Sequence, residues 1–156
     1  MERVVLRNGD GVEKSEFETG QSLSIELYYQ TSRRIELPYF WIGVSSKHGG
    51  HFGANMLLDG FPPDYIEGRG SITCTFKTLP LLPQIYSVSA GIRDHDGASI
   101  LIRSRQFAIF RVVGKTGLNS DVAESMARDT APILVPYEWK LPDGQIRVVN
   151  STSFEP

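Results

Sequence analysis

Alternation of apolar and polar side chains dominates the first two thirds of the chain. Residues 22–32, SLSIELYYQTS, place an apolar or aromatic side chain at every second position, and the same period returns in residues 38–46, 71–79 and 86–94. A period of two is that of a β-strand with one buried face. The side chains predicted to point inward are Leu23, Ile25, Leu27, Tyr29, Phe40, Ile42, Val44, Ile72, Cys74, Phe76, Tyr86, Val88, Ala90 and Ile92.

Turn signals separate these strands and set the fold class. RNGDG at residues 7–11 ends a first strand at residues 3–7, and a Gly- and Pro-rich loop at residues 47–70 leaves room for a short strand at residues 51–55. DHDG leads into a long final strand, residues 98–114, with a bulge near residues 104–106. The spacing predicts an all-β fold, an immunoglobulin-like antiparallel β-sandwich of about seven to nine strands.

The C-terminal part has a different pattern. After a sandwich domain at residues 1–114, residues 115–131 read as a linker, in which residues 118–129 carry the start signal of a short helix. Residues 132–142 read as one more strand, and Pro136 places it at an edge or a bulge. Residues 143–156 are a tail. A linker of this length lets the last strand pack on its own domain or exchange with a second copy in a dimer.

Composition and charge exclude several classes of protein. The 156 residues carry a formal net charge of -2, with a sequence pI of about 5.9, so we expect no nucleic-acid partner. No apolar stretch reaches the ~20 residues of a membrane span, and the N-terminus lacks the apolar region of a secretory signal, so we expect no direct membrane insertion. Cys74 is the one cysteine, which excludes a disulfide framework and a cysteine metal site.

The segment LPLLPQIY, residues 79–86, predicts an anchor for the strand that follows it. Two prolines restrict the chain to few conformations, and the leucines can close one end of the sandwich. Tyr86 then occupies the place of the corner tyrosine of immunoglobulin-like domains, whose hydroxyl bonds to nearby backbone. The alternative is that Tyr86 is an ordinary core aromatic residue.

The outward positions of three neighbouring strands predict a sugar-binding trough. Strands that begin near Tyr39, Ser87 and Leu101 share one sheet in an immunoglobulin order, with residues 51–55 at its edge. Small outward residues on the middle strand leave space beside aromatic rings, and a pyranose offers C–H groups to such rings and hydroxyls to polar groups. The predicted carbohydrate-binding residues are Tyr39, Trp41, Asn55, Ser87, Ser89 and Arg93, with Arg103 or Arg105 as further candidates.

Each of these residues also has a purely structural interpretation. Trp41 could be covered by the long loop or by the C-terminal strand, and Arg93 could pair with Asp94 or Asp96.

The sequence signals for a catalytic or a metal site are weak. His95 sits in a hairpin turn, and His48 and His51 lie three apart without a third ligand at a telling spacing. No nucleophile motif occurs, so we expect neither a catalytic residue nor a metal or cofactor site.

Four segments together resemble a known family. They are FETGQSLSIELYYQ (17–30), FGANMLLDG (52–60), LPLLPQIYSVSAGIRD (79–94) and VPYEW (135–139), in the order in which the family has them. The chain thereby resembles the C-terminal carbohydrate-binding domain of the nucleotide-binding subunit of O-antigen polysaccharide ABC transporters, the Wzt family. Gln84 departs from the glycine expected after Pro83, which leaves the type of this turn open.

The resemblance implies a function as well as a fold. It implies a non-catalytic domain that recognises O-antigen polysaccharide, at its modified terminus, in the bacterial cytoplasm. It also implies the transporter's ATPase and membrane subunits as partners at the inner face of the inner membrane, and a homodimer that exchanges the last strand. The sequence holds no G-x-x-x-x-G-K-[ST], so the family's upstream ATPase domain is not part of it.

Two other classes stay open on the sequence alone. In the first, the chain is a structural or protein-interaction sandwich that uses Trp41 and Trp139 for subunit contacts. In the second, it is a carbohydrate-active enzyme whose carboxylates lie on the same face, because sequence cannot show whether two of them converge.

Overall fold

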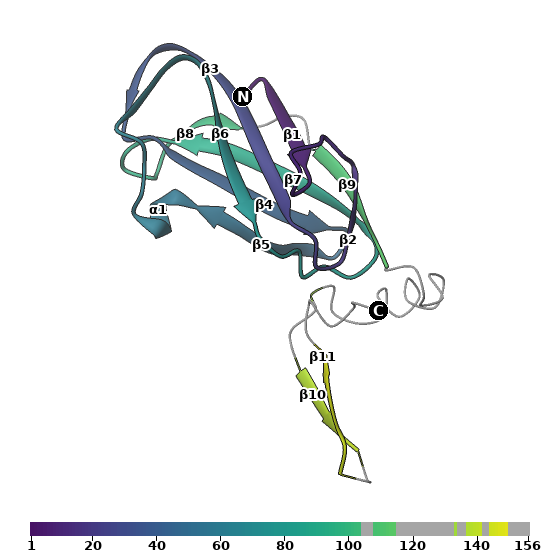
Figure 1. Ribbon diagram of the computed structural model, residues 1–156. Helices are drawn as coiled ribbons and strands as arrows, with labels where there is room; N and C mark the ends of the chain where they lie inside the picture. Colours follow the sequence, from purple (N-terminus) through teal and green to yellow (C-terminus); the bar gives the residue numbers. More distant parts are fainter. Residues whose placement is uncertain (104–107, 115–132, 134–136, 142–143, 150–156) are drawn as a thin grey trace.

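Two β-sheets packed face to face form the body of the molecule (Figure 1). The computed structural model describes residues 1–103, 108–114, 133, 137–141 and 144–149. The smaller sheet has the order β1 (Arg3–Arg7), β3 (Leu23–Glu36), β6 (Tyr65–Phe76). The larger sheet has the order β2 (Glu16–Glu18), β9 (Ala108–Val113), β7 (Ile85–Arg93), β4 (Tyr39–Ser46), β5 (Gly49–Asn55), and β8 (Ile100–Arg103) also pairs with β7. The predicted all-β sandwich is confirmed.

The core lies between the sheets and follows the predicted alternation. The inward residues of β3, β4 and β7 are almost fully buried except Tyr29, which is partly buried, and Leu23, Ile25 and Leu27 have 0% exposure. Phe17 and Phe110 extend the core with an edge-to-face contact at 5.8 Å between ring centroids. Burial of this apolar surface is the main force that holds the two sheets together.

The region predicted as one long loop, residues 47–70, contains more regular structure than expected. β5 has seven residues and pairs with β4 in six positions, a one-turn helix α1 (Met56–Asp59) follows it, and β6 begins already at Tyr65. The early part of β6 continues the ladder with β3 past an irregularity between Thr31 and Ile35. Glycine content suggested a loop here, but cross-strand pairing with β3 and β4 decides the conformation instead.

The predicted long final strand is divided in two. β8 and β9 both pair with β7, and residues 104–107 between them lie outside the described residues. Gly91 pairs with Arg103 and Val88 with Ala108, so three steps along β7 correspond to five steps along its partner. The bulge predicted near residues 104–106 falls outside the described residues.

One strand pair departs from the predicted antiparallel arrangement. β2 runs parallel to β9, with Phe17 opposite Val112. The turn at residues 8–11 reverses the chain after β1, and the next three-residue strand joins the other sheet. Phe17 is thereby buried at 1% exposure, which stabilises this short crossing between sheets.

The C-terminal part forms a separate two-stranded sheet. Ile133 makes an isolated bridge with Leu81, and β10 (Tyr137–Lys140) pairs with β11 (Ile146–Val149). β11 lies within residues 143–156, which were predicted to be a tail. The helix predicted at residues 118–129 lies outside the described residues, as does the whole of the predicted linker, residues 115–131.

Tyr86 anchors the start of β7 as the corner tyrosine. Its ring is 1% exposed and stacks on Phe110 at 5.5 Å. Its hydroxyl donates to the carbonyl of Leu82 at 2.7 Å and accepts from the Gln84 amide at 3.0 Å. Gln84, the departure from the family pattern, thus takes part in the corner. Burial raises the pKa of the Tyr86 phenol to about 12.

Tyr86→Phe should lower the free energy of unfolding at pH 7 by about 1–2 kcal/mol, because the Leu82 carbonyl loses its buried donor. The wild-type protein should also lose stability between pH 10 and about 12. In that range the unfolded chain releases the phenol proton while the folded chain still holds it. In Tyr86→Phe the free energy of unfolding should fall less over this pH range. Urea unfolding followed across pH measures both effects.

Tyr65→Phe is the matched control, since Tyr65 is 47% exposed. It should change the free energy of unfolding by less than about 0.5 kcal/mol and leave the alkaline decline intact. An equal loss in the two variants would contradict the anchoring role of Tyr86.

Candidate functional site

The outer face of the larger sheet brings the predicted site residues together. In the β4–β7 ladder Tyr39 lies opposite Arg93, Trp41 opposite Gly91, Gly43 opposite Ser89 and Ser45 opposite Ser87. In the β4–β5 ladder Trp41 lies opposite Asn55. Directly opposed residues share a face, so all six predicted residues lie on one surface. Whether they bind a ligand stays a prediction.

Trp41 changes the shape of this surface from the predicted one. A methyl group added at Gly91 would lie 2.6 Å from Trp41 Nε1 and 2.9 Å from Cε2, so the indole packs directly over the glycine. Trp41 Nε1 is buried and has no acceptor within the described part of the chain. Small residues on β7 were expected to leave an open trough, but the large neighbouring ring fills the space above Gly91. Two separate hollows result, with no lining residue in common.

The first hollow, called the Trp41 hollow, has a volume of about 610 Å³. It lies between β4, β5, α1 and β8 and combines apolar walls with polar and charged groups, two of them arginines and one a carboxylate. The lining residues are Trp41, Ile42, Gly53, Ala54, Asn55, Leu58, Asp59, Arg93, Ile100 and Arg103. Three of the six predicted residues, Trp41, Asn55 and Arg93, are among them.

Asn55 has a structural task in addition to its place in the hollow. Its side-chain oxygen accepts from the backbone N–H of Leu57 at 3.0 Å and so caps the N-terminus of α1. Gly60 ends the same turn with a φ of 74°. The cap fixes the direction of α1, and Leu58 and Asp59 thereby line the hollow. Sequence reasoning missed both residues, although an Asn before and a Gly after MLLD are signals of a helical turn.

Arg93 is held by the turn between β7 and β8. Its Nη1 donates to the carbonyls of Gly97 at 3.1 Å and Ala98 at 3.5 Å, in place of the pairing with Asp94 or Asp96 considered from the sequence. Asp96 instead accepts from the backbone N–H groups of Ala98 and Ser99. Tyr39 is half-buried beside Arg93 and is not among the residues that line either hollow.

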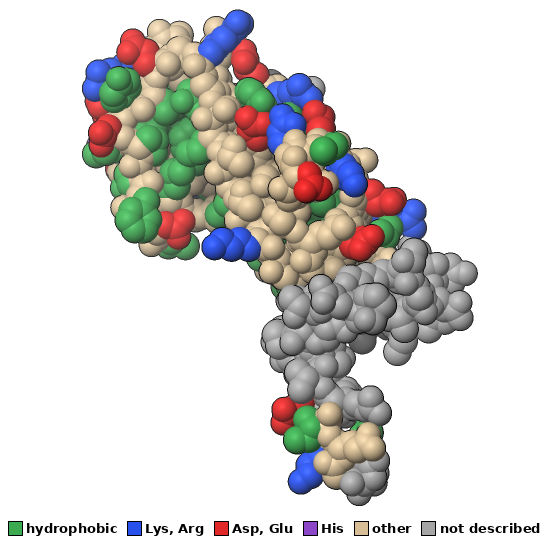
Figure 2. All heavy atoms as spheres, viewed as in Figure 1, with side chains coloured by type: hydrophobic (Ala, Val, Ile, Leu, Met, Phe, Trp, Pro, Cys, Tyr) green, Lys and Arg blue, Asp and Glu red, His purple; other side chains and the backbone are tan. Residues whose placement is uncertain are grey.

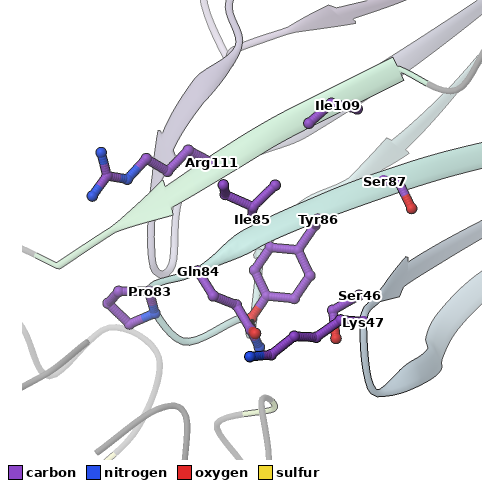
Figure 3. A pocket seen from close by; sticks show the side chains of 9 residues that line it. All are labelled: Ser46, Lys47, Pro83, Gln84, Ile85, Tyr86, Ser87, Ile109 and Arg111. Atoms are coloured by element: carbon purple, nitrogen blue, oxygen red, sulfur yellow. Dashed lines mark hydrogen bonds between the residues drawn. The ribbon is translucent and has the colours of Figure 1, made fainter. Parts of the chain in front are cut away.

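The second hollow, called the Ile109 hollow, has a volume of about 540 Å³ and lies at the other end of the same face (Figure 3). Ile85 and Ile109 are 64% and 63% exposed, and Lys47 and Arg111 lie on opposite sides of Ile85. Ser87 belongs to this hollow and bonds to Ser45 at 3.0 Å. Ser89 lies on β7 between the two hollows, and its hydroxyl donates to the Gly43 carbonyl at 3.4 Å. Of the six predicted residues, three therefore line the Trp41 hollow, Ser87 lines the Ile109 hollow, and Tyr39 and Ser89 line neither.

The histidines considered from the sequence have local partners. His95 Nδ1 lies 2.7 Å from Asp94 Oδ1, which raises the pKa of His95 and lowers that of Asp94. His51 Nε2 lies 2.8 Å from the Ser46 hydroxyl, and burial, with a smaller contribution from His48, lowers the pKa of His51. Among the described residues no group of three His, Cys, Asp or Glu side chains is placed to hold a metal ion.

Comparisons with known proteins identify what this sandwich is similar to. The family model of the Wzt C-terminal domain matches residues 1–123. A solved structure described as the crystal structure of the C-terminal domain of wzt superposes with a TM-score of 0.58 at 15% sequence identity, covering 70% of each chain. No curated protein sequence matches the chain. No helix of the described residues is both long and apolar enough to cross a membrane.

Gly91→Ala should destabilise the sandwich by about 1–3 kcal/mol, because the added methyl would also lie 2.6 Å from the Ile102 carbonyl oxygen, which belongs to the backbone. Trp41 would have to move, so tryptophan emission should shift in the folded state. Gly50→Ala, where nothing lies within 4 Å, is the matched control. Equal unfolding midpoints in urea for the two variants would contradict the close packing of Trp41 on Gly91.

Proposed function

Because the chain belongs to the Wzt C-terminal domain family, we propose that it is a non-catalytic domain that binds O-antigen polysaccharide for export by an ABC transporter. The family is associated with the O-antigen ABC transporter. The domain acts in the cytoplasm, at the inner face of the inner membrane, together with the ATPase and membrane subunits of the transporter. It recognises the modified terminus of the glycan.

The Trp41 hollow is the observation that carries this proposal. Trp41, Leu58 and Ile100 offer apolar surface to the C–H groups of a pyranose, while Asn55, Asp59 and Arg103 offer acceptors and donors to its hydroxyls. The volume of about 610 Å³ lies within the ~300–1,000 Å³ of small-molecule sites. Each sugar hydroxyl exchanges hydrogen bonds to water for hydrogen bonds to protein with little net gain in free energy, so the affinity of one domain for the glycan is modest.

A catalytic role is less well supported by the same residues. Glycosidases use two carboxyl groups on either side of the glycosidic bond. Asp59 is the one carboxylate among the described residues that line the Trp41 hollow. A single carboxylate can bond to a sugar hydroxyl, and the proposed domain therefore binds glycan without turnover.

Trp41→Ala should abolish binding of O-antigen polysaccharide, because the main stacking surface is removed. The measurement is isothermal titration calorimetry with the polysaccharide, made on the wild type and on the variant, because the substitution removes the tryptophan of the site. Since Trp41 also covers Gly91, circular dichroism must show a folded variant. Normal binding by folded Trp41→Ala would contradict the site.

Arg103→Ala tests the same site without touching the packed ring. Arg103 is exposed, so the fold should be unchanged, and loss of its hydrogen bonds should weaken glycan binding by about tenfold or more. Arg69→Ala removes an exposed arginine from the smaller sheet and is the control. Calorimetry that gives equal affinities for the two variants would place the glycan elsewhere.

We further propose that residues 132–142 exchange between the two protomers of a homodimer. The separate pairing of β10 with β11 supports this, since an isolated two-stranded hairpin is marginal in water without further packing. Deletion of residues 132–140 should weaken the dimer in sedimentation equilibrium. An unchanged dimer after the deletion would contradict the exchange.

A further inference from the structure

Two walls of the Trp41 hollow depend on short segments that lie outside the strands. One segment is α1, which supplies Leu58 and Asp59. The other is the turn between β7 and β8, residues 94–99, and the residues at its two ends, Arg93 and Ile100, line the hollow. Both segments lie at the same end of the sandwich (Figure 1), and apolar side chains are exposed at that end (Figure 2). The width of the hollow therefore depends on how α1 and this turn are placed relative to each other.

Hydrogen bonds fix the shape of each segment separately. α1 is capped by Asn55 at its start and by Gly60 at its end. In the turn, the Gly97 N–H donates to the Asp94 carbonyl at 2.8 Å, and the Asp94 N–H donates to the Ser99 carbonyl at 2.9 Å. These bonds lie within one segment or the other, so another contact must set the distance between the two.

Leu57 and Gly97 form such a contact. A Cβ added at Gly97 would lie 2.5 Å from Leu57 Cδ2 and 3.0 Å from Leu57 Cδ1, so the leucine side chain packs directly on the glycine backbone. The Leu57 backbone is itself fixed, because its N–H donates to the Asn55 cap at 3.0 Å. Gly97 has a φ of 69°, which favours glycine, so the turn and the contact both require a residue without a side chain.

This contact lies at the surface of the molecule. Leu57 is 40% exposed, whereas the core residues of β3 and β7 are almost fully buried. Because the hydrophobic stabilisation by a side chain grows with the apolar area that it removes from water, Leu57 contributes less to folding than a core leucine does. Its contact with Gly97 therefore matters more for the placement of the two segments than for the stability of the sandwich.

Both partners are joined to groups that line the hollow. Leu57 directly precedes Leu58 and Asp59 in α1. On the other side, the Gly97 carbonyl accepts a hydrogen bond from Arg93 Nη1 at 3.1 Å. A displacement of either partner is thus passed to side chains on opposite sides of the hollow.

We propose that the Leu57 side chain is a spacer between α1 and the turn at residues 94–99, and that its contact with Gly97 holds the Trp41 hollow at the width that binds glycan. The binding part of this role rests on the proposed function. Leu57 is a positioning residue, because it does not line the hollow and acts through its neighbours.

Leu57→Ala removes the spacer and leaves the backbone of α1 unchanged. The turn should then fluctuate more, so amide hydrogen exchange at residues 94–99 should become several-fold faster, and the affinity for O-antigen polysaccharide should fall about tenfold. The unfolding midpoint in urea should change little. Leu57→Met keeps a long apolar side chain and should restore both properties. Val12→Ala, at an apolar residue that is 53% exposed and remote from the hollow, is the control and should change neither.

Hydrogen exchange separates this proposal from the proposed function, because the measurement needs no glycan. Unchanged exchange at residues 94–99 in Leu57→Ala would overturn the spacer, whether or not the protein binds glycan. Wild-type affinity in folded Leu57→Ala would overturn it as well. Faster exchange in a protein that binds no polysaccharide would instead contradict the proposed function and leave Leu57 as a spacer of the two segments.

A double-variant cycle tests the contact itself. Gly97→Ala should increase hydrogen exchange in the turn, because the new methyl would lie 2.5 Å from Leu57 Cδ2 and the φ is unfavourable for alanine. In a Leu57→Ala background the methyl has room, so the same substitution should have a smaller effect. Gly11→Ala, at a φ of 78° with nothing within 4 Å, is the control for backbone strain, and its effect should be equal in both backgrounds. Strictly additive effects of Gly97→Ala and Leu57→Ala would overturn the direct contact.

Discussion

The fold depends on β7, which must be fully buried on one face and must carry small side chains on the other. Its inward side chains lie at the centre of the core between β4 and β9, with Val88, Ala90 and Ile92 at 0% exposure. Its outward residues are small, and at Gly91 even a methyl group would collide with Trp41 and with backbone. The Tyr86 hydroxyl bonded to Leu82 fixes where this strand begins. The position of β7 therefore determines both the core and the shape of the outer face.

The outer face shows how one aromatic residue can divide a surface. Trp41 fills the space above Gly91, and its ring becomes a wall of the Trp41 hollow instead of one side of a long trough. The opposite wall comes from α1, which Asn55 and Gly60 hold in place at its two ends. The residues proposed to bind glycan thus also hold the local structure. A loss of binding in a variant of this face therefore has meaning only when the fold is measured beside it.

The two sheets contribute differently to the behaviour of the molecule. The larger sheet carries both hollows, whereas in the smaller sheet Ile72, Cys74 and Phe76 of the edge strand β6 are only partly buried. In the proposed homodimer, the two Trp41 hollows, one in each copy, would raise the effective concentration for a repetitive polymer such as a polysaccharide.

The sequence by itself determined the class of fold, the inward side of each main strand and the corner at Tyr86, because alternation, turn residues and the proline-rich segment act locally. It also placed Trp41, Asn55 and Arg93 on one face. Only the tertiary structure decided that Trp41 lies over Gly91, that Asn55 caps α1, and that Leu58, Asp59 and Ile100 complete a hollow. These outcomes depend on which side chains from distant segments reach the same volume. The order of residues along one strand does not specify which side chains of distant segments lie beside it.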